Sequence, residues 1–195
     1  MSVHIIYMGK TWFTSDTHFF HSNIIKYCGR PYNNFDEMNN SIIKKWNERI
    51  KPEDTVYFLG DFNFKSGSGR GEGEPIKVQE IIRKLNGHII FIKGNHDGDS
   101  NGIKSPIKAM VIELGGMEIF CTHDPADSNN AFKLNLCGHV HEKWKSRIDV
   151  KHGMRTVIIN CGVDVWDFYP VSLEEILDEY NYVLKNKGLK TYRGK

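Results

Sequence analysis

Five short apolar segments of the chain each end in a polar cluster that contains Asp, His or Asn. Segments of this length, rich in Val, Ile, Leu, Phe and Thr, predict β-strands. In layered sheets the loops at the carboxyl ends of strands converge on one crevice, so we expect the clusters to meet although they are far apart in the sequence. The clusters are Asp16-Thr17-His18, Gly60-Asp61, Gly94-Asn95-His96-Asp97, Thr122-His123-Asp124 and Gly138-His139-Val140-His141.

Three other segments have the apolar spacing that is typical of amphipathic helices. We expect Asp36 to be the N-cap of the first helix. The last helix follows Ser172, which forms a predicted capping box with Glu175. The three apolar stripes span residues 38–50, 78–85 and 173–184.

Turn residues complete the predicted organisation. Gly9-Lys10 predicts a hairpin between residues 3–8 and 11–14, and Gly115-Gly116 predicts one between 110–114 and 117–121. Strands and helices alternate first, then strands dominate, and a helix closes the chain, so we expect one α/β or α+β layered domain over residues 1–195. The remaining predicted segments are a loop at 65–75, a strand at 156–160 and a basic tail at about 186–195.

Composition excludes several classes of protein. A chain of 195 residues buries enough surface to need no disulfide framework, and its four cysteines form no Cys-x-x-Cys pair, so we expect reduced cysteines rather than a zinc-thiolate site. No apolar run reaches the roughly 18 residues of a membrane span, and the first ten residues lack a signal peptide, which favours a cytoplasmic protein. A net charge of +2 argues against a surface dedicated to nucleic acid, so any basic partner site has to be local.

The side chains of the five clusters suit a metal site. Carboxylate, imidazole and amide oxygen together bind Mn, Fe, Zn, Co or Ni, and there are enough of them for two divalent ions. Each cluster alone, apart from the last, is better explained by turn and cap residues than by a function. His139 and His141, one residue apart at a strand end, are harder to explain without a metal, and the ordered occurrence of all five clusters favours the metal site.

The same residues resemble the calcineurin-like metallophosphoesterase superfamily over residues 14 to about 164. The segment from Phe13 to His21, Arg30-Pro31 and the segment from Asn160 to Asp164 are more narrowly similar to small bacterial and phage phosphoesterases. The resemblance implies a two-sheet β sandwich flanked by helices, with a dinuclear metal centre. It implies that one ion is held by Asp16, His18 and His141, the other by Asn95, His123 and His139, that Asp61 bridges them, and that His96 is the acid or charge stabiliser.

The chain departs from the family pattern at two positions. Phe64 stands where the family often has an acidic residue three positions after the bridging one. That residue usually lies outside the metal-binding set, so this departure changes the expected ligands little. Many members have Gly beside the histidine of the fourth motif, whereas this chain has His123-Asp124-Pro125.

Elementary chemistry supports a phosphoesterase. Two ions about 3.5 to 4 Å apart can share a hydroxide, hold it in line with phosphorus and neutralise the charge that develops on the phosphate oxygens. His96 is expected to protonate the departing alkoxide. Asp97 is expected to orient His96, with an ordinary turn cap as an equal alternative.

Predictions for the substrate rest on fewer residues. His21 and Arg30 are predicted to bind the substrate phosphate, with surface solvation as the alternative. Basic residues beside Trp144 between 142 and 155 could follow a polynucleotide, although a solvated hairpin is favoured. We expect a phosphodiesterase acting on nucleotides or nucleic acid. The alternatives are a phosphomonoesterase, a noncatalytic binding scaffold on the same fold, or a hydrolase of another bond such as an amide, and the oligomeric state stays open.

Overall fold

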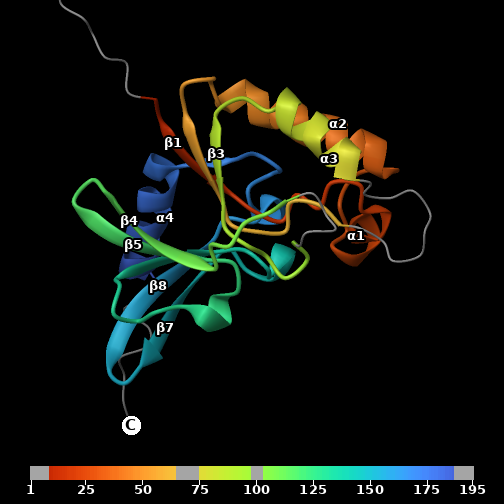
Figure 1. Ribbon diagram of the computed structural model, residues 1–195. Helices are drawn as coiled ribbons and strands as arrows, with labels where there is room; N and C mark the ends of the chain where they lie inside the picture. Colours follow the sequence, from red (N-terminus) through yellow and green to blue (C-terminus); the bar gives the residue numbers. More distant parts are fainter. Residues whose placement is uncertain (1–8, 65–74, 98–102, 187–195) are drawn as a thin grey trace, which may run out of the picture.

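Two β-sheets lie against each other in the computed structural model, which describes residues 9–64, 75–97 and 103–186 (Figure 1). One sheet has four strands in the order β3-β2-β1-β9, and the other has five in the order β4-β5-β6-β8-β7. Helices flank this sandwich, so the predicted layered fold with mixed sheets is confirmed.

The four-stranded sheet carries the first half of the chain. Strands β1, β2 and β3 are parallel, and the short β9 pairs antiparallel with β1. Side chains alternate between the two faces, so that Trp12 enters the core on one side of β1 and Phe13 the core on the other side. The bounds are β1 (Thr11–Thr14), β2 (Thr55–Phe58), β3 (His88–Phe91) and β9 (Val171–Ser172).

The five-stranded sheet carries the second half. Strands β5, β6 and β8 are parallel, and β4 and β7 close its edges as hairpin partners of β5 and β8. The predicted turn at Gly115-Gly116 is confirmed, because both glycines have positive φ, as a two-residue turn of this type requires. The bounds are β4 (Ala109–Leu114), β5 (Met117–Thr122), β6 (Leu134–Cys137), β7 (Ser146–Lys151) and β8 (Met154–Asn160).

Helices cover the sandwich and bury two separate cores. Met38 and Trp46 of α2 and Val78 of α3 share a core with Val56 and Phe58 of β2, on the outer face of the four-stranded sheet. The helix α4 packs against β7, β8 and β9 and contributes to the second core, which includes residues from both sheets. The helices are α1 (Ser22–Tyr27), α2 (Phe35–Arg49), α3 (Pro75–Lys84) and α4 (Leu173–Asn186).

Local details correct some predictions. The N-cap of α2 is Asn34 and not Asp36, because the Asn34 side chain accepts the backbone N–H of Glu37, which leaves Asp36 in the first helical turn. The six-residue α1 and the two-residue β9 were not predicted, since elements this short show no periodicity. The predicted residues 3–8 of the first hairpin, most of the loop 65–75 and the tail beyond 186 lie outside the described residues.

The two sheets are joined at the carboxyl ends of their parallel strands. Ser15, which follows β1, forms a bridge to Gly162, which follows β8. The Ser15 N–H donates to the carbonyl of Cys161 at 3.1 Å, and the Val163 N–H donates to the carbonyl of Ser15 at 3.1 Å. The loops that contain the five predicted clusters therefore leave both sheets at one edge of the sandwich.

The cysteines of the chain are present as free thiols. All four cysteines are free, and Cys121, Cys137 and Cys161 are buried. Burial raises the pKa of the Cys121 thiol to about 12, which keeps it protonated near neutral pH. Within the described ranges, none of the helices combines the length and the apolar composition needed to cross a membrane.

The capping box of α4 can be tested by substitution. The Ser172 Oγ accepts the Glu175 N–H at 3.2 Å, and the Glu175 carboxylate accepts the Ser172 N–H at 2.9 Å. We expect Ser172→Ala to lower the free energy of unfolding by about 1 kcal/mol, which corresponds to roughly 2–4 °C in Tm. The Ser172 hydroxyl also donates to the Glu175 carboxylate at 3.0 Å, so Ser172→Thr, which keeps a hydroxyl, is the control in thermal unfolding. A Ser172→Ala protein as stable as the wild type would show that the cap contributes nothing.

Candidate metal centre

The predicted ligands come from loops that follow three parallel strands of the four-stranded sheet and two parallel strands of the five-stranded sheet. Asp16 and His18 follow β1, Asp61 follows β2, and Asn95 follows β3. In the second sheet, His123 follows β5, and His139 and His141 follow β6. The structure brings all seven together in two groups.

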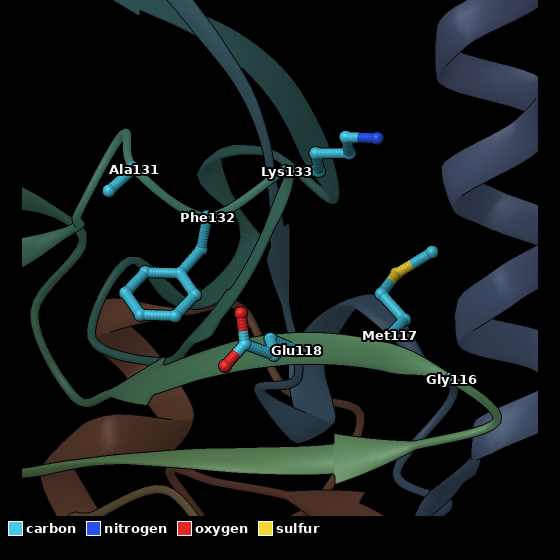
Figure 2. A pocket seen from close by; sticks show the side chains of 6 residues that line it. All are labelled: Gly116, Met117, Glu118, Ala131, Phe132 and Lys133. Atoms are coloured by element: carbon cyan, nitrogen blue, oxygen red, sulfur yellow. The ribbon is translucent and has the colours of Figure 1, made fainter.

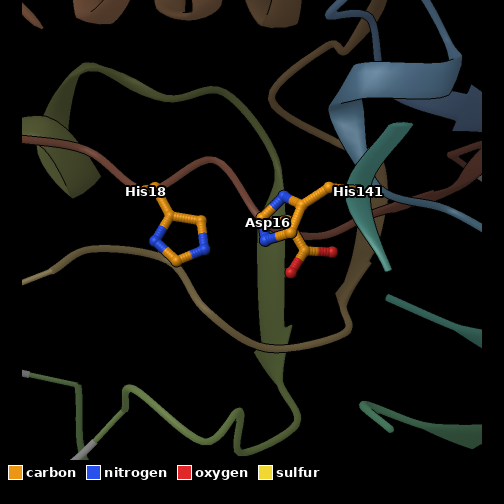
Figure 3. A group of neighbouring side chains, drawn as sticks. All are labelled: Asp16, His18 and His141. Carbon is orange, nitrogen blue, oxygen red and sulfur yellow. The ribbon is translucent and has the colours of Figure 1, made fainter. Parts of the chain in front are cut away.

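The first group consists of Asp16, His18 and His141. Each offers one ligand atom, and these atoms lie within 4.8 Å of one another. Figure 3 shows the two imidazoles extending from their backbones toward the region of the Asp16 carboxylate. The His18 Nε2 atom is buried and has no hydrogen-bond partner in the protein. A buried imidazole nitrogen without a partner is costly unless it binds a cation, so this atom fits a metal ligand.

The second group consists of Asp61, His123 and His139, whose ligand atoms also lie within 4.8 Å of one another. The Asn95 Oδ1 atom joins them, at 2.8 Å from the Nε2 of His123 and 2.8 Å from the Nδ1 of His139. Carboxylate, amide oxygen and two imidazoles form a donor set that suits borderline divalent transition metals.

The Asp61 carboxylate lies close to both groups. Its Oδ2 atom is 3.2 Å from the Nε2 of His123 in the second group and 3.7 Å from the Nε2 of His18 in the first. Its Oδ1 atom accepts the backbone N–H of His96 at 2.8 Å. This position fits the bridging role that the resemblance implies.

Further contacts orient two of the imidazoles. The Nδ1 of His123 lies 2.7 Å from the carbonyl of Leu59, and the Nδ1 of His141 lies 3.0 Å from Asp164. Such partners hold a ligating histidine in the tautomer that leaves Nε2 free for the metal. Sequence reasoning gave Asp164 no role, although the residue ends the segment that carried the narrower resemblance.

The prediction that Arg30 binds substrate is wrong, and so is the surface alternative. Its side chain is fully buried and forms an ion pair with Asp164, with Nε to Oδ1 at 2.7 Å and Nη2 to Oδ2 at 2.9 Å. The guanidinium also donates to the carbonyls of Asp16 at 2.7 Å and Thr17 at 2.9 Å, and to the Met38 sulfur. Arg30 therefore holds the loop of the first group in place, because its five N–H donors are all used inside the protein.

The Asp97 carboxylate contacts backbone groups. It accepts the N–H groups of Asp61 at 2.8 Å, Phe62 at 3.2 Å and Gly94 at 2.9 Å. It thus ties the loop after β2 to the loop after β3, which corresponds to the alternative of a turn cap. His96 lies at the open side of the site, with 41% of its side chain exposed and its Nε2 4.0 Å from the Asp61 Oδ2.

Many of the ligands have a backbone conformation that is unusual for residues other than glycine. Such left-handed residues cluster at functional sites, where the surrounding structure holds them in place, and Asp and His tolerate this region better than most residues. The ligands with positive φ are Asp16 (57°), His18 (49°), Asp61 (59°), His139 (72°) and His141 (49°).

Two glycines allow the loops to approach this closely. A Cβ atom at Gly94 would overlap the Asp61 carboxylate and backbone nitrogen, and one at Gly138 would overlap Ser15 and the Asp16 carboxylate. Any larger residue would therefore displace a carboxylate of the site. This close approach explains why glycine precedes the ligands in these two motifs.

The charges of the groups are strongly coupled before a cation binds. Burial would lower the pKa of His123, but its hydrogen bond to Asp61 and the charge of Asp16 raise the pKa to about 9. Burial raises the pKa of Asp16. Burial and the Arg30 charge together hold the pKa of His18 well below its usual range, so this imidazole is neutral and able to act as a ligand.

Two cavities adjoin the two groups. A cavity of about 450 Å³ touches His18 and His141, and it is lined further by His21 and His96. His21, predicted to bind substrate, thus lies in its wall, with its Nδ1 3.3 Å from the Nδ1 of His18. A second cavity of about 270 Å³ touches Asn95 and His123. Figure 2 shows a separate cavity of about 290 Å³ near the turn between β4 and β5, which none of the predicted ligands lines.

The basic segment near Trp144 is the hairpin of β7 and β8. Lys145 forms an ion pair with Glu179 at 3.7 Å and lies over the ring of Trp166. Arg147 lies over the ring of Trp144 itself. These partners favour the hairpin interpretation over a track for a polynucleotide.

Comparisons with known proteins identify the family of the chain. The profile of the calcineurin-like phosphoesterase superfamily domain matches residues 10–167. The chain is 38% identical over 189 residues to the uncharacterized protein MJ1445 of Methanocaldococcus jannaschii, covering 94% of this chain and 97% of the relative. It is 26% identical over 219 residues to the Gene 66 protein of Mycobacterium phage L5, and the match covers 94% of this chain and 100% of the relative.

A solved structure is also similar. The protein AQ665 of Aquifex aeolicus, of unknown function, matches with a TM-score of 0.65 and 27% identity, over 88% of this chain and 99% of that one. The profile match confirms the family resemblance predicted from the motifs. The match to AQ665 shows that the two proteins have similar folds over most of this chain.

The position of Asp61 predicts that one substitution affects both groups. We expect Asp61→Asn to weaken metal binding at both groups, because the substitution replaces the shared carboxylate by a neutral amide, whereas Asp164→Asn should weaken metal binding only at the first group, by about 10–100-fold. Metal content by mass spectrometry after gel filtration measures both effects. The exposed Asp167→Asn is the matched control. If Asp61→Asn retains one full equivalent of metal per chain, Asp61 does not bridge the two groups.

The raised pKa of His123 predicts how metal affinity depends on pH. A histidine with a pKa of about 9 is protonated at pH 7, so a cation must displace its proton, and affinity should rise about tenfold per pH unit from pH 7 toward 9. Calorimetry at pH 7 in buffers of different ionisation enthalpy should detect the released proton. His88→Gln, at the far end of β3, should behave as wild type. Affinity that is constant above pH 7 would contradict the Asp61–His123 coupling.

Proposed function

Because the chain belongs to the calcineurin-like phosphoesterase superfamily, we propose that it is a dinuclear-metal-dependent phosphodiesterase that acts on nucleotides or nucleic acid. The observation that carries this proposal is the pair of ligand groups with the Asp61 carboxylate between them. Each group includes residues from both sheets, so the fold itself assembles the site.

The residues present fit two divalent ions. Asp16, His18 and His141 would hold one ion, Asn95, His123 and His139 the other, and Asp61 both. Mn, Fe, Zn, Co and Ni all bind ligands of these types, so the proposal includes all five metals. When bound, two such ions supply Lewis-acid stabilisation of the phosphate oxygens and a nucleophile at neutral pH.

We assign the proton transfer to His96. Its partly exposed imidazole lies beside Asp61 and lines the larger cavity, so a leaving group placed there would be within reach of a proton donor. Asp97 acts as a positioning residue rather than a partner in proton transfer, because its carboxylate holds the backbone of Asp61 and Gly94. Arg30 and Asp164 likewise position the first group through His141 and the carbonyl of Asp16.

Two cavities favour a diester over a monoester. A phosphodiester carries two organic groups on phosphorus, and a cavity adjoins each ligand group. A phosphomonoesterase needs room for only one organic group, and it stays the second candidate. A noncatalytic scaffold is less well supported, because a binding role gives no reason to keep the unpaired buried Nε2 of His18. The cytoplasmic location predicted from the sequence stays part of the proposal, and the four free cysteines are compatible with it.

Hydrolysis assays with defined esters test this proposal. Purified protein loaded with Mn²⁺, Ni²⁺ or Mg²⁺ should hydrolyse bis(4-nitrophenyl) phosphate faster than 4-nitrophenyl phosphate. Chelation should abolish turnover, and added metal should restore it. Full activity in a metal-free preparation would refute the mechanism, and faster hydrolysis of the monoester would favour the phosphomonoesterase.

The role of His96 has its own test. We expect His96→Ala to retain its metal content and to lose about 100-fold or more in kcat on a diester with an alkyl leaving group. The loss should be smaller for a nitrophenolate leaving group, which needs less protonation. His88→Ala is the control, and equal rates for His96→Ala and wild type on the alkyl ester would remove His96 from the mechanism.

A further inference from the structure

The cavity beside the first ligand group has aromatic walls. The rings of His21 and Phe64 stack at a centroid distance of 4.0 Å with an angle of 15° between their planes. His96 lies edge-on to Phe64 at 5.0 Å, and Tyr27 lies edge-on to His21 at 6.3 Å. Aromatic side chains from three separate segments thus surround a space of about 450 Å³ that begins at two predicted metal ligands.

Tyr27 is the most unusual member of this wall. Its side chain is 72% exposed, the largest value among the exposed large hydrophobic residues of the described chain. It stands at the end of α1 and lines the cavity. An exposed aromatic ring at the mouth of a cavity is a surface on which a flat group can stack.

Polar side chains complete the lining. Asn23, Glu142 and Lys143 face the same cavity and offer hydrogen-bond donors and acceptors together with one negative and one positive charge. A purely apolar ligand would leave these groups unmatched, whereas a heteroaromatic ring with polar edges matches both the flat walls and the polar lining. A base within a duplex is covered on both faces by its neighbours and could not enter.

We propose that this cavity, lined by Tyr27, Phe64 and Lys143, binds one unpaired nucleobase of the ester whose phosphate lies at the metal centre. The proposal rests on the proposed phosphodiesterase function and specifies how that site selects its substrate. Phe64 is central to it, because its ring lines the cavity and packs against both His21 and His96. The nucleobase belongs either to a small nucleoside diester or to a single-stranded polynucleotide.

A pair of substrates that differ only in their bases tests the proposal. Dithymidine phosphate and its analogue with both bases removed contain the same phosphodiester and sugars. The Mn²⁺-loaded wild type should show a kcat/KM about tenfold or more higher for the base-containing dimer. Tyr27→Ala and Phe64→Leu should lose that preference, which is measured as the ratio of kcat/KM for the two dimers and should fall to about one. Tyr27→Trp should keep it, and Tyr182→Ala, a tyrosine exposed on α4, is the matched control.

A binding measurement separates this proposal from the proposed function. Stacking quenches 2-aminopurine fluorescence, so 2-aminopurine riboside 5′-monophosphate should be quenched by the wild type and not by Tyr27→Ala. If no ester is hydrolysed but this quenching is found, the nucleobase site is supported and the proposed phosphodiesterase function is wrong. If both dimers are hydrolysed equally and no quenching occurs, the nucleobase site is wrong and the phosphodiesterase stands.

Longer substrates distinguish the two sources of the base. A dimer hydrolysed as efficiently as a single-stranded 12-mer indicates a small nucleoside diester as the substrate. A 12-mer preferred by more than about tenfold indicates a polynucleotide. In either case the same 12-mer in a duplex should be a poorer substrate, and a duplex preferred over the single strand would overturn the proposal.

Discussion

The shared position of Asp61 is the constraint on which the site depends. A buried carboxylate lies against imidazoles from both ligand groups, and its conformation is fixed by the Asp97 carboxylate, which accepts its backbone N–H. Burial opposes ionisation of Asp61, but the hydrogen bond and charge of His123 hold its pKa below the usual value. The site therefore carries negative charge in the region where two sets of ligand atoms meet, and this arrangement favours cations.

This arrangement requires an unfavourable backbone conformation at several ligands, and buried contacts behind the ligands stabilise it. The left-handed conformation of Asp16 and His18 is held by the buried guanidinium of Arg30, which binds the carbonyls of Asp16 and Thr17. The same guanidinium neutralises Asp164, and Asp164 in turn orients His141. One buried ion pair thus connects Arg30, which holds the loop of Asp16 and His18, with Asp164, which lies 134 residues further along the chain and orients the third ligand of the same group.

The sequence was sufficient to predict the elements with clear periodicity and the convergence of the strand ends. The stripe on α2, the turn at Gly115-Gly116 and the capping box at Ser172 each follow from local chemistry, and each was found. Short elements such as α1 were missed, because six residues give no periodic signal. The role of Arg30 was not predicted, and the two alternatives for Asp97 could not be separated, because a charged residue near a motif looks the same in sequence whether it faces a ligand or the backbone of a neighbouring loop.

Each ligand group draws residues from both sheets, with Asp16 and His18 opposite His141, and Asp61 opposite His123 and His139. Any cation held there fastens the two layers of the sandwich to each other, so opening the layers would require release of the ion. Binding to the folded state alone adds about 1.4 kcal/mol of stability for each tenfold excess of free metal over its Kd. The persistence of this protein in a cell would therefore follow the local supply of transition metals as well as its own hydrophobic cores.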